Sequence, residues 1–138
     1  MSDDKRADAL IKQIISAIKD KDKEVLKSLF SKKALDESND FENDVDCLFE
    51  IIQGEVESWK RDGLSSSEQI DSGKRSLMIR FAFDIKTDID LYSCYLIDYT
   101  TDTINPDNQG VYMLEVKLAD STNTGSWQER MRAGIYLH

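Results

Sequence analysis

The chain has 138 residues, a length typical of one domain built around one hydrophobic core. Its hydrophobic content of 40% predicts a globular protein and argues against disorder. Acidic residues outnumber basic residues 27 to 18, and the net charge of -9 disfavours binding to nucleic acids and to anionic membrane surfaces. We therefore expect a single domain over residues 1–138 with no nucleic-acid partner.

Targeting signals give little guidance on the compartment. No apolar run approaches the roughly 18 residues that a membrane-spanning helix needs, so no membrane span is expected. Met1 is followed at once by the polar residues 2–6, and no signal peptide is visible. This start fits a cytoplasmic protein, and it equally fits a chain from which an export signal has been removed.

The first half of the sequence predicts helices. Apolar residues at helical spacing predict an amphipathic helix over about 4–19. Asp22 and Ser31 are suited to cap two short helices, and Asp40 opens a further helix with one apolar face. Gly54 stands where the end of that helix needs a positive φ.

After Gly54 the hydrophobic period changes from 3.6 to 2, which indicates strands. A turn is expected at Asp62-Gly63 and another at 71–73. The expected strands cover residues 55–60, 65–71 (at best an edge strand), 76–86, 91–103, 112–118 and 134–137. Helices followed by long antiparallel strands predict an α+β fold, with the N-terminal helices packed on a strongly curved antiparallel sheet.

The pairing of the two longest strands decides which side chains are buried. If Thr87 pairs with Leu91, Asp98 faces away from the helices, opposite Arg80, which makes a favourable cross-strand pair. A slip of one residue would reverse every side chain and bury Asp98. We favour the outward position, because burying an unpaired carboxylate costs several kcal/mol or forces its protonation.

The same register places Tyr95 and Tyr99 on the helix-covered face, as core residues or as the lining of a pocket. Tyr112 and Trp59 are further candidates for that lining. Together these four aromatic residues predict a pocket for a small apolar ligand.

The opposite face of the sheet is then unusually apolar for a monomer. Apolar residues on both sides of a strand indicate that both faces of the sheet are covered, and the helices can cover only one face. We therefore expect a homodimer through the outer face. The predicted interface residues are Met78, Arg80, Leu96, Asp98 and Met113.

Catalytic and cofactor motifs are not recognisable. The single histidine, His138, stands at the C-terminus, so mechanisms based on a histidine general base lack support. Neither a zinc-ligand spacing nor a glycine-rich phosphate loop is present in the sequence. We expect no metal and no cofactor, and we identify no catalytic residue.

The order of elements resembles a known superfamily. The segment Ile18 to Phe30, with a polar break at residues 20–22, is similar to a phrase common in the cone-shaped fold of nuclear transport factor 2 and ketosteroid isomerase. This resemblance implies a cone-like sheet, of the cystatin or ketosteroid-isomerase kind, closed by a long and a short helix. An enzyme of this kind would hold a carboxylate base inside the cone, with tyrosine or aspartate donors.

A narrower resemblance rests on phrases spread over most of the chain: residues 26–35, 49–54, 105–112 and 134–136. They are similar to a bacterial family of unknown function whose members are often exported lipoproteins. The resemblance implies an extracellular or cell-envelope location, although the lipoprotein cysteine is absent from the start of this sequence. Otherwise the protein would be cytoplasmic.

Three functions are consistent with these observations. The favoured one is a non-catalytic domain that binds a small ligand or a partner, which needs only an apolar, tyrosine-lined cavity. An isomerase or dehydratase needs a titrating group inside the cone, and Asp98 is the candidate if the register slips. A structural dimerisation module needs neither.

Overall fold

The computed structural model describes residues 3–38 and 40–118, together with the backbone of 132–135. Within these residues, four helices precede the sheet: α1 (Asp3–Asp20), α2 (Lys23–Leu29), α3 (Lys32–Glu37) and α4 (Phe41–Ile51). The predicted caps are present. The side chains of Asp22, Ser31 and Asp40 each accept a hydrogen bond from the backbone N–H three residues later.

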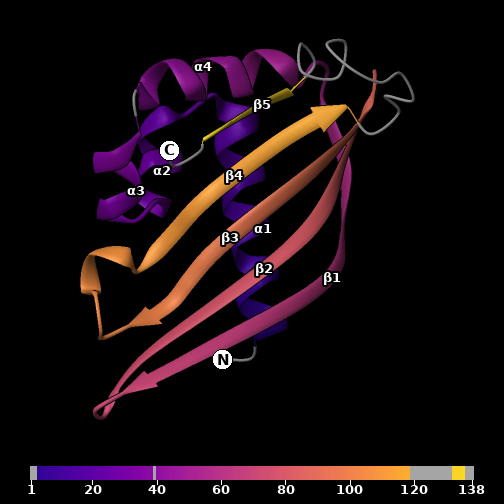
Figure 1. The fold of residues 1–138 in the computed structure, drawn as a ribbon. Helices are drawn as coiled ribbons and strands as arrows, with labels where there is room; N and C mark the ends of the chain where they lie inside the picture. Colours follow the sequence, from indigo (N-terminus) through magenta and orange to yellow (C-terminus); the bar gives the residue numbers. More distant parts are fainter. Residues whose placement is uncertain (1–2, 39, 119–131, 136–138) are drawn as a thin grey trace.

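The second half of the chain forms an antiparallel sheet (Figure 1). Its described strands are β1 (Val56–Asp71), β2 (Lys74–Thr87), β3 (Leu91–Asp102), β4 (Gly110–Leu118) and β5 (Arg132–Ile135). They neighbour one another in chain order, and the short 3-10 helix η1 (Pro106–Asn108) connects β3 to β4. The predicted α+β class, with N-terminal helices and a curved antiparallel sheet, is confirmed. The predicted last strand overlaps β5, and its final residues, like His138, lie outside the described residues.

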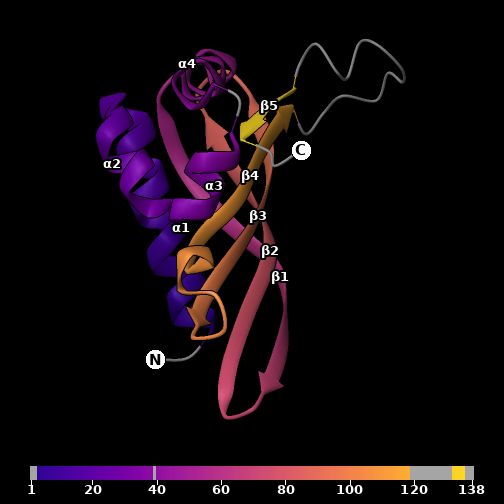
Figure 2. The same ribbon diagram turned by 60° about the vertical axis from the view of Figure 1, so that its left-hand side comes forward.

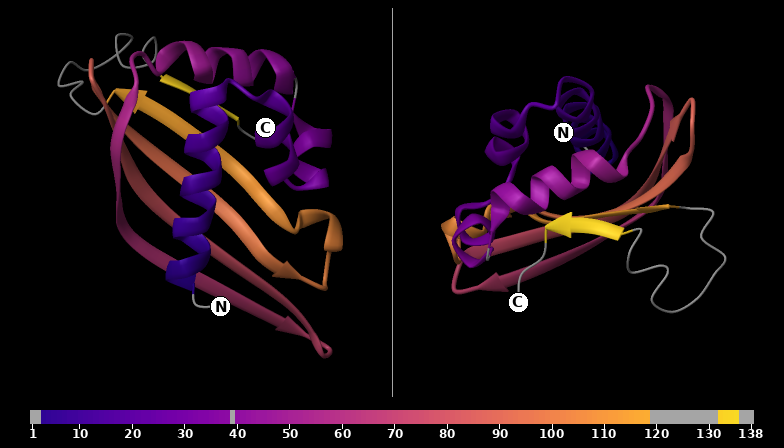
Figure 3. Two further views of the ribbon diagram at one scale, coloured as in Figure 1. Left: turned by 180° about the vertical axis from the view of Figure 1, so that it is seen from behind. Right: turned by 90° about the horizontal axis from the view of Figure 1, so that it is seen from above.

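The helices lie together on one face of the sheet (Figure 2), and α1 crosses that face (Figure 3). Its apolar stripe and the facing side of the sheet form the core. From α1 this core takes Leu10, Ile11, Ile14, Ile15 and Ile18. From β2 and β3 it takes Ile79, Phe81, Phe83, Ile85, Tyr92, Cys94 and Leu96.

The strand β1 is longer than the sequence predicts. The expected turn at Asp62-Gly63 is a β-bulge between Asp62 and Ser65, so the two predicted strands form one continuous strand. Gly63 has a φ of +68°, which glycine adopts without steric cost. A second bulge, between Val56 and Ser58, lies at the beginning of β1.

The register of β2 and β3 corrects the prediction by one residue. Lys86, rather than Thr87, pairs with Leu91. The Thr87 side chain instead stabilises the turn that follows β2. Its hydroxyl accepts hydrogen bonds from the backbone N–H groups of Ile89 and Asp90, and it donates one to the carbonyl of Gln53. Because a strand alternates its side chains, this shift exchanges the two faces of β3.

Candidate ligand-binding groove

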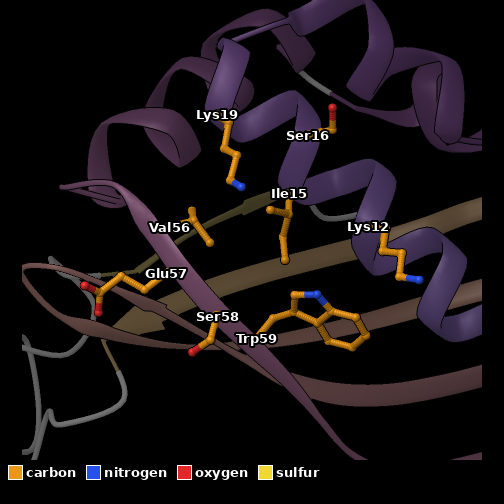
Figure 4. A pocket seen from close by; sticks show the side chains of 8 residues that line it. All are labelled: Lys12, Ile15, Ser16, Lys19, Val56, Glu57, Ser58 and Trp59. Atoms are coloured by element: carbon orange, nitrogen blue, oxygen red, sulfur yellow. The ribbon is translucent and has the colours of Figure 1, made fainter.

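A groove runs between the second half of α1 and the beginning of β1. Its volume is about 520 Å³. Figure 4 shows the side chains that line it. They are Lys12, Ile15, Ser16 and Lys19 from α1, and Val56, Glu57, Ser58 and Trp59 from the start of β1.

Helical spacing explains why four residues of α1 share this groove. Lys12, Ile15, Ser16 and Lys19 stand at i, i+3, i+4 and i+7, which is one stripe of a helix. On the opposite wall, the bulge inserts Glu57 as an extra residue in β1. A bulge bends its strand and redirects nearby side chains, so it shapes the wall that faces α1.

The floor of the groove is apolar. Ile15 is 5% exposed and belongs to the core, while Val56 and Trp59 are partly buried against the core. Trp59 stands opposite the buried Ile85 of β2, which fixes its side chain on the helix-covered side. In Figure 4, Ile15 points from α1 toward the Trp59 indole. The groove therefore offers a flat aromatic surface and aliphatic contacts.

A second hollow continues the groove past Lys19 and Val56, which line both. Its volume is about 350 Å³, and Ile18, Ile52 and Gly54 contribute to its walls. Gly54 has a φ of +89°, and it lets the chain turn from α4 into β1. Together the two hollows form one elongated depression along α1.

Beyond Lys12 and Trp59, ion pairs join α1 to β1. Arg61 of β1 binds Asp8 of α1 through its Nε atom at 2.9 Å, and Asp4 through an Nη atom at 3.2 Å. The hydrogen bond to Asp8 is the main reason that the pKa of Arg61 is raised. These pairs fasten β1 to the first half of α1.

The rim of the groove carries hydrogen-bond donors that are not used within the described part of the chain. Neither Lys12 nor Lys19 forms an ion pair with a described residue. The Trp59 indole N–H donates no hydrogen bond to a described residue either. Two acidic residues also line the depression: Glu57 lines the groove and Glu55 lines the second hollow. The Glu57 carboxylate points away from Trp59 (Figure 4).

Asp98 lies on the helix-covered face, contrary to the prediction. It is 0% exposed, and its Oδ2 accepts a hydrogen bond of 3.1 Å from Nε of Arg6 in α1. Its Oδ1 is buried and has no hydrogen-bond partner among the described residues. Burial raises the pKa of Asp98 above its ordinary value, and the Arg6 guanidinium opposes part of that shift.

The four aromatic residues predicted to line one pocket are separated by the sheet. Trp59 lies in the groove, whereas Tyr95 and Tyr99 lie on the outer face because of the changed register. Tyr112 is the extra residue of a bulge in β4. Its ring contacts the Tyr99 ring edge to face, with 5.5 Å between the two ring centroids. Burial raises the pKa of both hydroxyls, which keeps them protonated.

The predicted interface set also divides between the two faces. Arg80, Ile97 and Met113 form one cross-strand row on the outer face, and Met78 stands on the same side of β2. Leu96 is 0% exposed beneath the helices, so its predicted position in an outer interface is wrong, as is that of Asp98. The residue that takes the central outer position is Ile97.

The groove itself could not be recognised from the sequence, apart from Trp59. Lys12 and Lys19 read as ordinary solvated positions of an amphipathic helix, and Ser16 carries no signal at all. What makes them a site is the strand that runs beside them. The seven-residue spacing of the two lysines was the one available signal, and it is common on helix surfaces.

In the described residues, no group of three or more histidine, cysteine or acidic side chains could hold a metal ion. Among the helices of the described part, none combines the length and the apolar character needed to cross a membrane.

These features define the class of the protein: an α+β fold with helices on one face of an antiparallel sheet and a groove beside the first strand. The chain belongs to the family described as Domain of unknown function (DUF5104), whose model matches residues 13–124. The expected membership of a family of unknown function is therefore confirmed. No curated protein matches the chain.

Proposed function

We propose that this protein is a non-catalytic binding domain whose α1–β1 groove takes a small, largely apolar ligand. The observation that carries the proposal is the apolar floor of Ile15, Val56 and Trp59 in an elongated depression. The volume of about 520 Å³ falls within the range of roughly 300–1,000 Å³ that ligand sites occupy.

The enzyme alternative has weaker geometric support. Asp98 is buried, but Tyr95 and Tyr99 lie on the other face of β3 and cannot donate to a substrate beside it. Tyr92 shares the face of Asp98, yet six residues of strand separate the two by roughly 20 Å. Its hydroxyl already accepts a hydrogen bond from the Gln53 N–H. The described residues thus do not bring a base and oxyanion donors together.

Two resemblances support a binding role for an exported protein. The succession of helices and antiparallel strands agrees with the cone-shaped superfamily of nuclear transport factor 2 and ketosteroid isomerase, in which the cone can hold a ligand. The phrases that resemble a bacterial family of unknown function, whose members are often exported lipoproteins, suggest a location in the cell envelope. Both are parts of the proposal, and recovery of the full gene start would test the second.

Filling the groove should abolish ligand binding. Ser16 is exposed and lines the groove, so Ser16→Trp places a large ring over the floor without entering the core. We expect the affinity for decanol, used as a neutral apolar probe, to fall by about tenfold or more, because loss of the apolar contacts removes roughly 0.8 kcal/mol per methylene. Emission of Trp59 in a Trp127→Phe background reports binding to the parent chain, and calorimetry reports binding to the variant.

The matched control is Gln13→Trp, an exposed position of the same helix that does not line the groove. It should bind decanol as the parent does. Equal losses in both variants, or unchanged binding in Ser16→Trp, would place the ligand elsewhere and remove the basis of the proposal.

We propose, as a second function, that two copies associate through the outer face of the sheet. Apolar side chains on this face are only partly exposed, although the described helices gather on the other face of the sheet (Figure 2). They are Met78, Ala82, Tyr95, Ile97, Tyr99 and Met113. Side chains of both signs surround them, including Arg80, Asp84, Glu115 and Lys117, so a two-fold arrangement can bring opposite charges together.

Association should be lost in Ile97→Glu, which puts a carboxylate at the centre of the outer face. We expect wild-type protein to sediment as a dimer at high micromolar concentration and the variant to sediment as a folded monomer. A stable interface should bury about 1,000 Å² or more in total, so one central charge should be decisive. A monomeric wild-type protein would overturn this second function and leave the groove proposal intact.

A further inference from the structure

We infer that the ligand of the α1–β1 groove is an amphipathic anion: a single apolar chain that ends in a carboxylate or phosphate group. This inference rests on the proposed function, and it adds the chemical class of the ligand. The apolar chain would lie on the floor formed by Ile15, Val56 and Trp59. The anionic group would be held at the rim by the ammonium groups of Lys12 and Lys19.

The charge distribution around the groove supports an anion. The protein carries a net charge of -9, and four of its other cations on the helical side form ion pairs: Arg6, Lys23, Lys32 and Lys33. Lys12 and Lys19 lack an ion pair with a described residue, as do Lys21 and Lys27. Of these four, Lys12 and Lys19 line the α1–β1 groove, which has an apolar floor. Two cations that flank an apolar floor complement an anion with an apolar tail.

The geometry permits both lysines to act on one ligand. Seven residues of helix separate them by roughly 10 Å along the axis, which two long side chains can span. In Figure 4 the Lys19 ammonium is directed toward β1, while the indole nitrogen of Trp59 lies on the side of its ring that faces α1. The Trp59 N–H adds a neutral donor near the same rim. Near the other end, Asp4 and Asp8 both form ion pairs with Arg61, which offsets one of their two negative charges.

The test compares ligands that share one tail and differ in the head. Decanoate, decyl phosphate, decanol and decyltrimethylammonium are titrated into the Trp127→Phe protein, with Trp59 emission as the readout. We expect decanoate and decyl phosphate to bind about tenfold more tightly than decanol, and the trimethylammonium compound to bind more weakly than decanol. The stronger of the two anions identifies the head group as a carboxylate or a phosphate.

Variants locate the anionic head. Lys12→Gln and Lys19→Gln should each weaken decanoate binding by about two- to fivefold, the range of a partly exposed charge pair, and leave decanol binding unchanged. Lys74→Gln, in the distant β2 strand, is the matched control. It should change neither the affinity for decanoate nor the affinity for decanol. Raising the NaCl concentration should reduce the difference in binding affinity between decanoate and decanol, because salt screens the charge interaction.

The outcomes separate the two proposals. If decanol binds as tightly as decanoate, the anion inference is overturned while the apolar groove stands. If decanoate is preferred but both lysine variants retain the full preference, the head lies elsewhere and the inference is also overturned. If none of the four compounds binds, the proposed function fails together with the inference.

Discussion

Replacing Leu96 with glutamate should unfold the protein. Leu96 is 0% exposed and stands between Phe81 of β2 and Leu114 of β4 on the helix-covered face. The substitution removes a buried aliphatic side chain and places an unpaired carboxylate in the core. The expected loss exceeds about 4 kcal/mol, a large part of the roughly 5–15 kcal/mol that stabilises a domain of this size. Far-UV circular dichroism and urea unfolding measure it.

The adjacent residue provides the control for this prediction. Ile97→Glu introduces the same carboxylate one position later, on the outer face, and should cost less than about 1 kcal/mol in the monomer. A folded Leu96→Glu protein together with an unfolded Ile97→Glu protein would restore the register predicted from the sequence. The pair of variants therefore tests the orientation of β3 and, with it, the burial of Asp98.

Replacing Asp98 with asparagine should change how stability depends on pH. The pKa of Asp98 is raised in the folded state from its ordinary value of 3.8, mainly by burial, so the folded protein binds this proton more tightly than the unfolded chain does. The contribution of Asp98 to the free energy of unfolding therefore rises as the pH falls through its folded-state pKa. It levels off below about 3.8, where both states are protonated.

Above its folded-state pKa, Asp98 is ionised while it remains buried, and the desolvation of that form lowers the stability of the folded protein. Asp98→Asn should accordingly be at least as stable as wild type at neutral pH, and its advantage should shrink on acidification. Urea unfolding over a pH series measures the difference. An Asp98→Asn protein that is clearly less stable at neutral pH and recovers relative to wild type in acid would mean that the pKa of Asp98 is lowered instead.

Arg6 favours the ionised form of Asp98 and opposes part of the pKa shift that burial causes. Arg6→Gln should destabilise the protein by about 1–2 kcal/mol at neutral pH, less than for a fully buried pair because the Arg6 side chain is 40% exposed. In the Asp98→Asn background the same change should cost little. Arg75→Gln, which breaks the exposed pair with Glu68, is the matched control, with an expected cost below about 1 kcal/mol. Equal costs of Arg6→Gln in both backgrounds would show that the pair is not coupled.

The sequence predicted the helical half of the fold well, because its signals are local. The caps at Asp22, Ser31 and Asp40 act within three residues, and the apolar stripe of α1 is continuous along the helix. Gly63 shows the limit of such reasoning in strands. A glycine in a polar stretch reads as a turn, but here it accommodates a bulge in a strand of 16 residues. Only the pairing with β2 distinguishes the two.

The register of β3 was missed for a tertiary reason. Thr87 reads as a strand residue, yet its hydroxyl serves the turn at residues 88–90 and the carbonyl of Gln53 after α4. A hydroxyl that bonds to a distant segment leaves no trace in the local pattern. Both faces of β3 are also rich in apolar residues, so hydrophobicity did not reject the wrong choice. This one-residue error placed Asp98, Leu96, Tyr95 and Tyr99 on the wrong face of the sheet.

The candidate site depends even more on long-range arrangement. Lys12 and Lys19 are separated in sequence from Val56 and Trp59 by the whole of α2, α3 and α4. Nothing in either segment specifies that they lie side by side. The sequence predicted Trp59 as a pocket-lining residue, but it grouped Trp59 with tyrosines that lie on the other face of the sheet. Its partners became evident only when α1 was placed across the sheet.

The central claim is that the groove between α1 and β1 is the ligand site, and chemical-shift mapping tests it most directly. The protein is labelled with ¹⁵N and titrated with decanoate, and amide shifts are followed along the chain. We predict that the largest changes fall on α1 between Lys12 and Lys19 and on β1 between Val56 and Trp59, with saturation at one equivalent. Changes concentrated around Tyr95, Tyr99 and Tyr112 on the outer face, with α1 unaffected, would contradict the claim.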